Sequence, residues 1–108
     1  MRVLVTGATG FVGRALSPAL LQAEHEVSVA VRNPTAADIP DGITVHAISD
    51  IGPDTDWTEA LSGADAVIHL ACISNDPSFE LDPGLGKSIN FDAFRPLVRA
   101  AKRAGVDR

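Results

Sequence analysis

Apolar positions near the start of the chain change their spacing within a few residues, from a short run to a helical period. Residues 3–5 are consecutive aliphatic side chains, which is typical of a strand buried on both faces of a sheet. Glycines follow at positions 7, 10 and 13, and apolar residues then recur at helical spacing over about 11–23. This pattern predicts a strand, a glycine turn and a helix. Pro18 falls inside the helical stretch, where proline costs about 3 kcal/mol, so we expect a local distortion or a late helix start.

Three later segments have the apolar pattern of further strands. Alternating apolar residues predict strands at 27–31 and 43–47. The segment 66–71 is apolar with scarcely a break, so we expect this strand to be buried on both faces of the sheet.

Helical patterns separate these strands. They predict a short turn at 36–39, a second helix over about 57–61 capped by Asp54 or Thr55, and a last helix over about 89–105. Strands that alternate with helices form parallel sheets with right-handed crossovers. We therefore predict an α/β fold of three layers, α/β/α, with about four parallel strands in the order 3-2-1-4, the first half of a doubly wound fold.

The three glycines each meet a physical need if this turn binds a dinucleotide. Gly7 permits the tight turn after the strand, Gly10 lets the backbone approach a diphosphate, and Gly13 lets the helix pack closely on the sheet. The start of the helix then offers unpaired N–H groups and a positive dipole end to the phosphates. The alternative is an ordinary tight turn, but the position between strand and helix favours dinucleotide binding.

Composition limits the class of protein. A length of 108 residues allows one domain at most, and 45% hydrophobic with 21% charged residues is ordinary for a globular chain. The net charge of −5 argues against nucleic acid or an anionic membrane as a partner. No apolar run approaches the roughly 20 residues of a membrane span. The chain begins directly with a core strand and holds a single cysteine, so we expect no signal peptide and a cytoplasmic location.

The turn sequence from Thr6 to Gly13, TGATGFVG, resembles the short-chain dehydrogenase/reductase superfamily. It is most similar to the extended branch of NAD(P)-dependent epimerases and dehydratases that act on nucleotide sugars. Two later segments, 69–72 (HLAC) and 88–106, also resemble that family. The resemblance implies a Rossmann-type domain over 1–108 and cofactor contacts along the turn at Gly7, Thr9, Gly10, Phe11, Val12 and Gly13.

The same resemblance implies cofactor contacts elsewhere. Asp50 and Ile51 would hold the adenine, by a carboxylate hydrogen bond and by packing on the ring. Leu70 and Ala71 would line the phosphate and ribose region, and Asn90 would lie near the nicotinamide ribose. Each role has an alternative that stays open. Asp50 could instead be a turn-forming residue, and the Asn90 side chain could instead hydrogen-bond its own backbone at the start of a helix.

The end of the second strand distinguishes between the two cofactors. An acidic residue about 20 residues past the glycine turn favours NAD, whereas an arginine there accommodates the 2′-phosphate of NADP. The chain has Val31-Arg32-Asn33 at this place, without an acid. We therefore favour NADP over NAD, with a solvated Arg32 and bound NAD as the alternative.

Two further residues have chemistry that invites a catalytic interpretation. His69 lies inside an apolar strand, where a histidine is more often a satisfied core residue than a base. Cys72 stands where the resembled family usually has alanine, and nothing nearby in sequence would lower its pKa, so we interpret it as a packing residue. The histidines and the cysteine show no metal-ligand spacing, and we predict no metal site.

The resemblance also implies catalytic residues that the chain does not contain. Enzymes of that family use a Tyr-x-x-x-Lys pair after their fifth strand, and this chain has no tyrosine. We therefore expect the N-terminal part of a hydride-transferring oxidoreductase, truncated before the fifth strand and inactive alone. A non-catalytic dinucleotide-binding or interaction module is the alternative. We also expect the exposed edge of the fourth strand to cause self-association.

Overall fold

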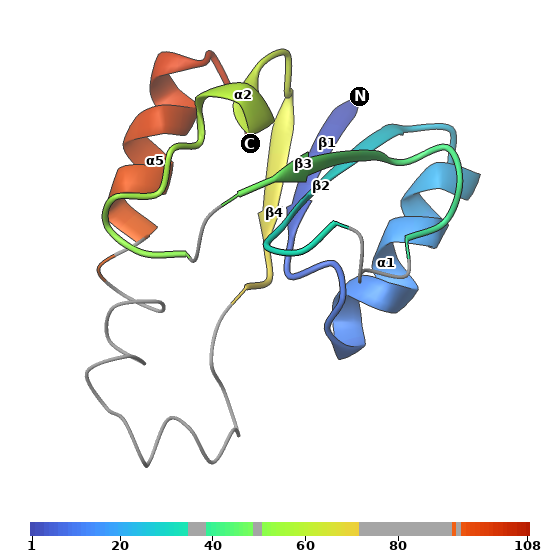
Figure 1. Cartoon of the computed structure of the whole chain (residues 1–108). Coiled ribbons are helices and arrows are strands. Elements are labelled where there is room, and N and C mark those ends of the chain that lie inside the picture. The colour runs from blue at the N-terminus through green and yellow to red at the C-terminus, as the bar shows by residue number, and fades with distance from the viewer. Residues whose placement is uncertain (35–38, 49–50, 72–91, 93) are drawn as a thin grey trace.

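The structure, a computed structural model, describes residues 1–34, 39–48, 51–71, 92 and 94–108. Figure 1 shows its elements. In chain order they are β1 (Arg2–Thr6), α1 (Phe11–Gln22), β2 (Glu26–Val31), β3 (Thr44–Ala47), α2 (Thr58–Leu61), β4 (Ala66–His69) and α5 (Phe94–Arg103). Most of the predicted turn at 36–39, and the start of the predicted last helix, lie outside the described residues.

The four strands form one parallel sheet in the order β3-β2-β1-β4. β1 lies in the centre, with Val5 opposite Val29 of β2 on one side and Ile68 of β4 on the other. The predicted strand order 3-2-1-4 is confirmed. Parallel strands end at the same edge of a sheet, so the glycine turn after β1 and the ends of β2 and β4 lie together (Figure 1).

Helices cover both faces of the sheet, because successive side chains of a strand point in opposite directions. Val3, Val5 and Val29 belong to the core on the α1 face, together with Leu20 and Leu21 of that helix. The opposite core contains Leu4, Ala30, Trp57, Leu61 and Leu97, and it lies between the sheet and helices α2 and α5 (Figure 1). The predicted three-layer architecture is therefore confirmed.

The helix starts agree only in part with the sequence. α1 begins at Phe11, as predicted, and continues through Pro18 to Gln22, so the alternative of a late start is wrong. α2 is preceded by Trp57, and neither Asp54 nor Thr55 caps it. The Asp56 carboxylate instead accepts a hydrogen bond from the Thr58 backbone N–H at 3.0 Å, and this bond holds the pKa of Asp56 below its ordinary value. The Thr55 hydroxyl oxygen accepts from the Gly52 N–H, which stabilises the preceding loop.

β4 is shorter and less buried than its apolar sequence predicts. It ends at His69, and only Ala66 of its four residues is fully buried. The expectation of an edge without backbone partners is also wrong in part. The Val67 N–H donates to the Arg108 carbonyl at 2.7 Å, and the Asp107 N–H donates to the Asp65 carbonyl at 3.0 Å. The last residues of the chain therefore already pair with the outer side of β4.

Candidate functional site

The glycine turn is a tight backbone structure between β1 and α1. Gly7 has a φ of +72°, a conformation that favours glycine. The Gly10 N–H donates to the Gly7 carbonyl at 3.1 Å and closes the turn. Gly10 then has an extended backbone and immediately precedes α1. The sequence interpretation of Gly7 as the residue that permits the turn is in accord with this geometry.

Gly13 allows the first turn of α1 to lie directly on the glycine turn. A Cβ atom at Gly13 would collide with the Gly7 carbonyl oxygen and would lie 2.6 Å from the Ala8 Cα. Both are backbone atoms, so they could not move aside as the end of a flexible side chain does. The close packing that the sequence predicts for Gly13 is therefore present.

The end of β4 lies against the same turn. A Cβ atom at Gly7 would lie 2.7 Å from the Ala71 nitrogen and 2.7 Å from the Leu70 carbonyl carbon. The Leu70 N–H also donates to the Thr6 carbonyl at 3.1 Å, which extends the β1–β4 pairing to this point. The structure thus brings Leu70 and Ala71 to the glycine turn, as the predicted cofactor contacts require.

A hydroxyl network fixes this approach. The Thr6 hydroxyl oxygen accepts a hydrogen bond from the Ala71 N–H at 3.2 Å and lies 2.6 Å from His69 Nδ1. A hydroxyl group can accept two hydrogen bonds and donate one, so the Thr6 hydroxyl can pair with Nδ1 in either tautomer of the ring. Thr6 is fully buried, whereas the half-buried ring of His69 lies 6.1 Å, centroid to centroid, from that of Phe94. Burial lowers the pKa of His69, which favours the neutral ring. The interpretation of His69 as a satisfied residue of the sheet is in accord with these contacts.

Helix α1 presents an open N-terminus to this edge. Its cap residue, Gly10, has no side chain to bond the first N–H groups, and the first turn contains no acidic residue. Phe11 is 96% exposed and Val12 is also exposed, so no core packing covers the helix start. N–H groups at an uncovered helix start attract anions, and a diphosphate suits both the charge and the backbone access.

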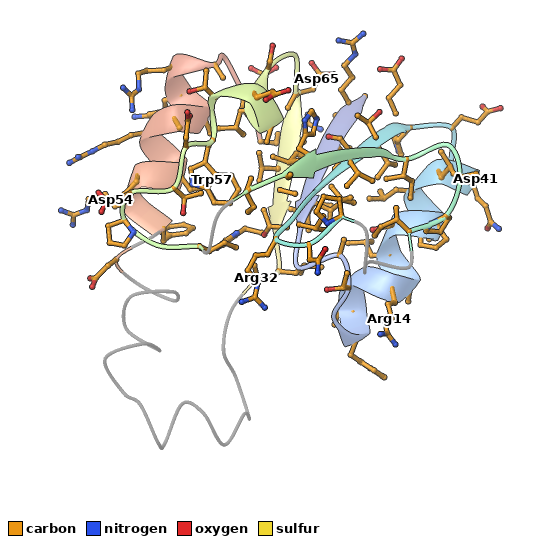
Figure 2. The ribbon with its side chains drawn as sticks, viewed as in Figure 1. Arg14, Arg32, Asp41, Asp54, Trp57 and Asp65 are labelled. Carbon is orange, nitrogen blue, oxygen red and sulfur yellow. The ribbon has the colours of Figure 1, made fainter. Side chains whose placement is uncertain are left out.

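Some of the remaining predicted site residues are described, and others are not. Thr9 is exposed within the glycine turn. Arg32 is exposed at the end of β2, on the edge where the strands end (Figure 2). Ile51 is half-buried and packs against the core beneath α2 and α5. Asp50, Cys72 and Asn90 lie outside the described residues.

Sequence reasoning missed Thr6 as a residue of this site. Its signal was available, because Thr6 is the last residue of the first strand and directly precedes Gly7. The parallel register that places Thr6 opposite His69 could be found only in the structure.

Within the described ranges, no helix is long and apolar enough to cross a membrane. In that same part of the chain, no three histidine, cysteine or acidic side chains come together in a way that could hold a metal ion.

The His69 network predicts a pH dependence of stability. Burial lowers the pKa of folded His69 below its unfolded value of about 6.5. The contribution of neutral His69 to the free energy of unfolding is therefore complete above that pH, and it is lost as pH falls through the folded pKa. We expect the difference in unfolding free energy between wild type and His69→Asn to shrink from about pH 7.5 to about pH 5. Urea unfolding followed by Trp57 fluorescence measures it. A difference that is constant with pH would contradict a lowered pKa of His69 in the folded chain.

Two named enzymes are similar in sequence to this chain over nearly its whole length. A 3-beta-hydroxysteroid dehydrogenase of Mycolicibacterium neoaurum is 34% identical over 111 aligned positions, which cover 99% of this chain and 30% of that protein. A dihydroflavonol 4-reductase of Zea mays is 33% identical over 120 positions, which cover 98% of this chain and 32% of that protein.

A solved structure, MoeE5 in complex with UDP-glucuronic acid and NAD, is similar to this fold with a TM-score of 0.80 at 28% identity. The superposition covers 100% of this chain and 35% of that one. This chain therefore spans about a third of the length of these three proteins. The sequence model of the NAD dependent epimerase/dehydratase family matches residues 3–108. Together with the sheet order and the glycine turn, this match shows that the chain belongs to the NAD dependent epimerase/dehydratase family.

Proposed function

We propose that this chain binds NADP in preference to NAD at the carboxyl edge of its sheet, as the cofactor-binding part of a hydride-transferring oxidoreductase. One observation carries the proposal: the glycine turn lies directly against Leu70 and Ala71, beside an uncovered helix start. The backbone there leaves access for a diphosphate, and the family is dinucleotide-dependent.

The proposed contacts involve each part of the cofactor molecule in turn. The N–H groups at Phe11, Val12 and Gly13 would bind the diphosphate, as first-turn groups of α1 without intrahelical acceptors. Arg32 would bind the 2′-phosphate, because a guanidinium forms paired, charge-assisted hydrogen bonds with a phosphate dianion. From the family resemblance, Asp50 and Ile51 would hold the adenine, and Asn90 would lie near the nicotinamide ribose.

The proposed substrates are nucleotide sugars or similar molecules with a hydroxyl or carbonyl group. The matched proteins include a hydroxysteroid dehydrogenase, a dihydroflavonol reductase and a protein bound to UDP-glucuronic acid. Oxidation of a secondary alcohol sends a hydride from carbon to the nicotinamide and the hydroxyl proton to a base. This chain has no tyrosine to serve as that base, so we propose that it binds the cofactor without turnover when alone. A non-catalytic dinucleotide-binding module is the second candidate, because all the contacts proposed above are contacts to the cofactor.

Calorimetric titration with NADP and with NAD tests the cofactor preference. We expect Arg32→Ala to weaken NADP binding by about tenfold, since a hydrogen bond to a charged group contributes about 1.5–3 kcal/mol. NAD affinity should stay within about twofold because NAD lacks the 2′-phosphate. Arg99→Ala, on the exposed side of α5, is the matched control and should change neither affinity. Equal loss of NADP and NAD affinity in Arg32→Ala would contradict the assignment.

Alanine substitutions at Gly13 and Gly10 distinguish a packing role from a cofactor-binding role. Gly13→Ala places a methyl group against backbone atoms and should lower the free energy of unfolding by about 1–3 kcal/mol. Gly10→Ala meets only the Gly7 carbonyl oxygen, at 3.3 Å, so its loss of stability should be smaller while its dinucleotide affinity falls. Urea unfolding and calorimetry measure the two quantities. Unchanged affinity in folded Gly10→Ala would remove Gly10 from the site.

We also propose that the chain self-associates through β4, which ends the described sheet on one side. The support is the half-buried apolar surface of Val67 and Ile68, although residues 107–108 pair with part of this edge. Sedimentation velocity at micromolar concentration should show a dimer or a larger species. A single monomeric species would contradict self-association.

A further inference from the structure

Charge is unevenly distributed along this chain. Residues 94–108 contain five of its nine lysines and arginines and one of its fourteen acidic residues, so this segment has a net charge of +4. The remaining residues, 1–93, contain four basic and thirteen acidic residues and have a net charge of −9. Most of the basic residues of the last segment belong to α5, which covers one face of the sheet together with α2 (Figure 1). An acidic chain therefore carries one basic helix on its surface.

The basic residues of α5 form a stripe on its solvent side. Arg95, Arg99 and Lys102 lie at i, i+4 and i+7, a spacing that places them on one side of a helix. Leu97, which is buried in the core, lies on the opposite side. The three basic side chains are exposed, and in the described part of the chain none of them has an ion-pair partner. The stripe is therefore accessible to another molecule.

The formation of α5 accounts for only part of this stripe. Lys102 and Arg103 lie in the last turn, where the helix dipole favours basic residues. Arg95 lies in the first turn, where the dipole disfavours them, and it lies one helical turn from the like charge of Arg99. Because neither arginine stabilises the helix through these interactions, a role in binding is favoured.

An apolar row runs beside the basic stripe. Phe94 is 50% exposed and Val98 is 39% exposed, and each directly precedes an arginine of the stripe. The two lie one helical turn apart and therefore on the same side of α5. The Phe94 ring lies 6.1 Å, centroid to centroid, from the ring of His69, so this row begins beside the end of β4. The stripe and the row together form the α5 surface, whose residues are Phe94, Arg95, Val98, Arg99 and Lys102.

We propose that the α5 surface binds an acidic amphipathic helix of a partner protein. Such a helix presents a row of apolar side chains with carboxylates beside it, which complements both rows of the α5 surface. Nucleic acid and anionic membranes also carry negative charge, but the net charge of −5 repels both. A helix of ten residues spans about 15 Å, so we expect a transient complex with a Kd on the order of micromolar. This binding goes beyond the proposed cofactor function and does not depend on it.

Fluorescence anisotropy with a labelled synthetic peptide tests the proposal. The peptide is helical, with leucine along one side and glutamate on both flanks of that side, and a second peptide has glutamine in place of every glutamate. We expect the acidic peptide to bind wild type with an affinity that falls as salt is added. The glutamine peptide should bind at least about tenfold more weakly, because it lacks the charges that complement the stripe. Equal affinities for the two peptides would overturn the proposal.

Variants in each row assign the binding to the α5 surface. Arg99→Glu should weaken the acidic peptide by about threefold to tenfold, and it places opposite charges at i and i+4 with Arg95, which supports the helix. Arg14→Glu, at an exposed position of α1, is the matched control for net charge and should leave the affinity within about twofold. Val98→Ser should weaken binding by about threefold to tenfold through loss of an apolar contact. Equal effects of Arg99→Glu and Arg14→Glu, or an unchanged affinity in Val98→Ser, would overturn the proposal.

Other occupants of the α5 surface would give different results. Single-stranded DNA or vesicles of anionic phospholipid that bind wild type more tightly than the acidic peptide does, and that lose affinity in Arg99→Glu, would overturn the proposal in favour of nucleic acid or a membrane. We expect wild type and Arg99→Glu to sediment alike. Loss of self-association in Arg99→Glu would also overturn the proposal, since a second copy of this chain would then occupy the α5 surface.

Discussion

The close approach of three backbone segments at Gly7 determines the rest of this site. The end of β1, the first turn of α1 and the exit of β4 meet there with no room for a Cβ at Gly7 or Gly13. The Thr6 hydroxyl links β1 to Ala71 and to His69 at the same point. Because these contacts involve backbone atoms, the shape of the site depends on the sheet register more than on flexible side chains.

This constraint links the fold to the proposed chemistry. The parallel sheet places all strand ends at one edge, and helices on both faces hold it there through two apolar cores. That edge then combines the helix start at Phe11 and Val12, which lacks a side-chain cap, with the exposed Arg32. The net charge of −5 makes this local positive character a property of the edge and not of the whole chain.

Much of the fold could be predicted from the sequence, since apolar spacing reports burial directly. The sheet order and the packing role of Gly13 followed from the strand, turn and helix pattern. The residue that bonds the start of α2 could not be predicted from the sequence. Asp54 and Asp56 are equally able to accept a hydrogen bond, and only the path of the chain places Asp56 next to the Thr58 N–H. The apolar run of β4 overstates its burial, because a strand at the end of the sheet, where the predicted order 3-2-1-4 already places it, is covered less completely than a central strand. The Thr6 network joins residues distant in sequence, which no local pattern encodes.

The most direct test of the account is the backbone amide spectrum of the isotopically labelled chain during titration with NADP. We expect large shifts for the amides of Phe11, Val12, Gly13 and Ala71, which lie at the site, and small shifts for those of α5 such as Arg99 and Lys102. Shifts that are absent at the glycine turn while the folded chain binds NADP elsewhere would contradict binding of the dinucleotide at this turn.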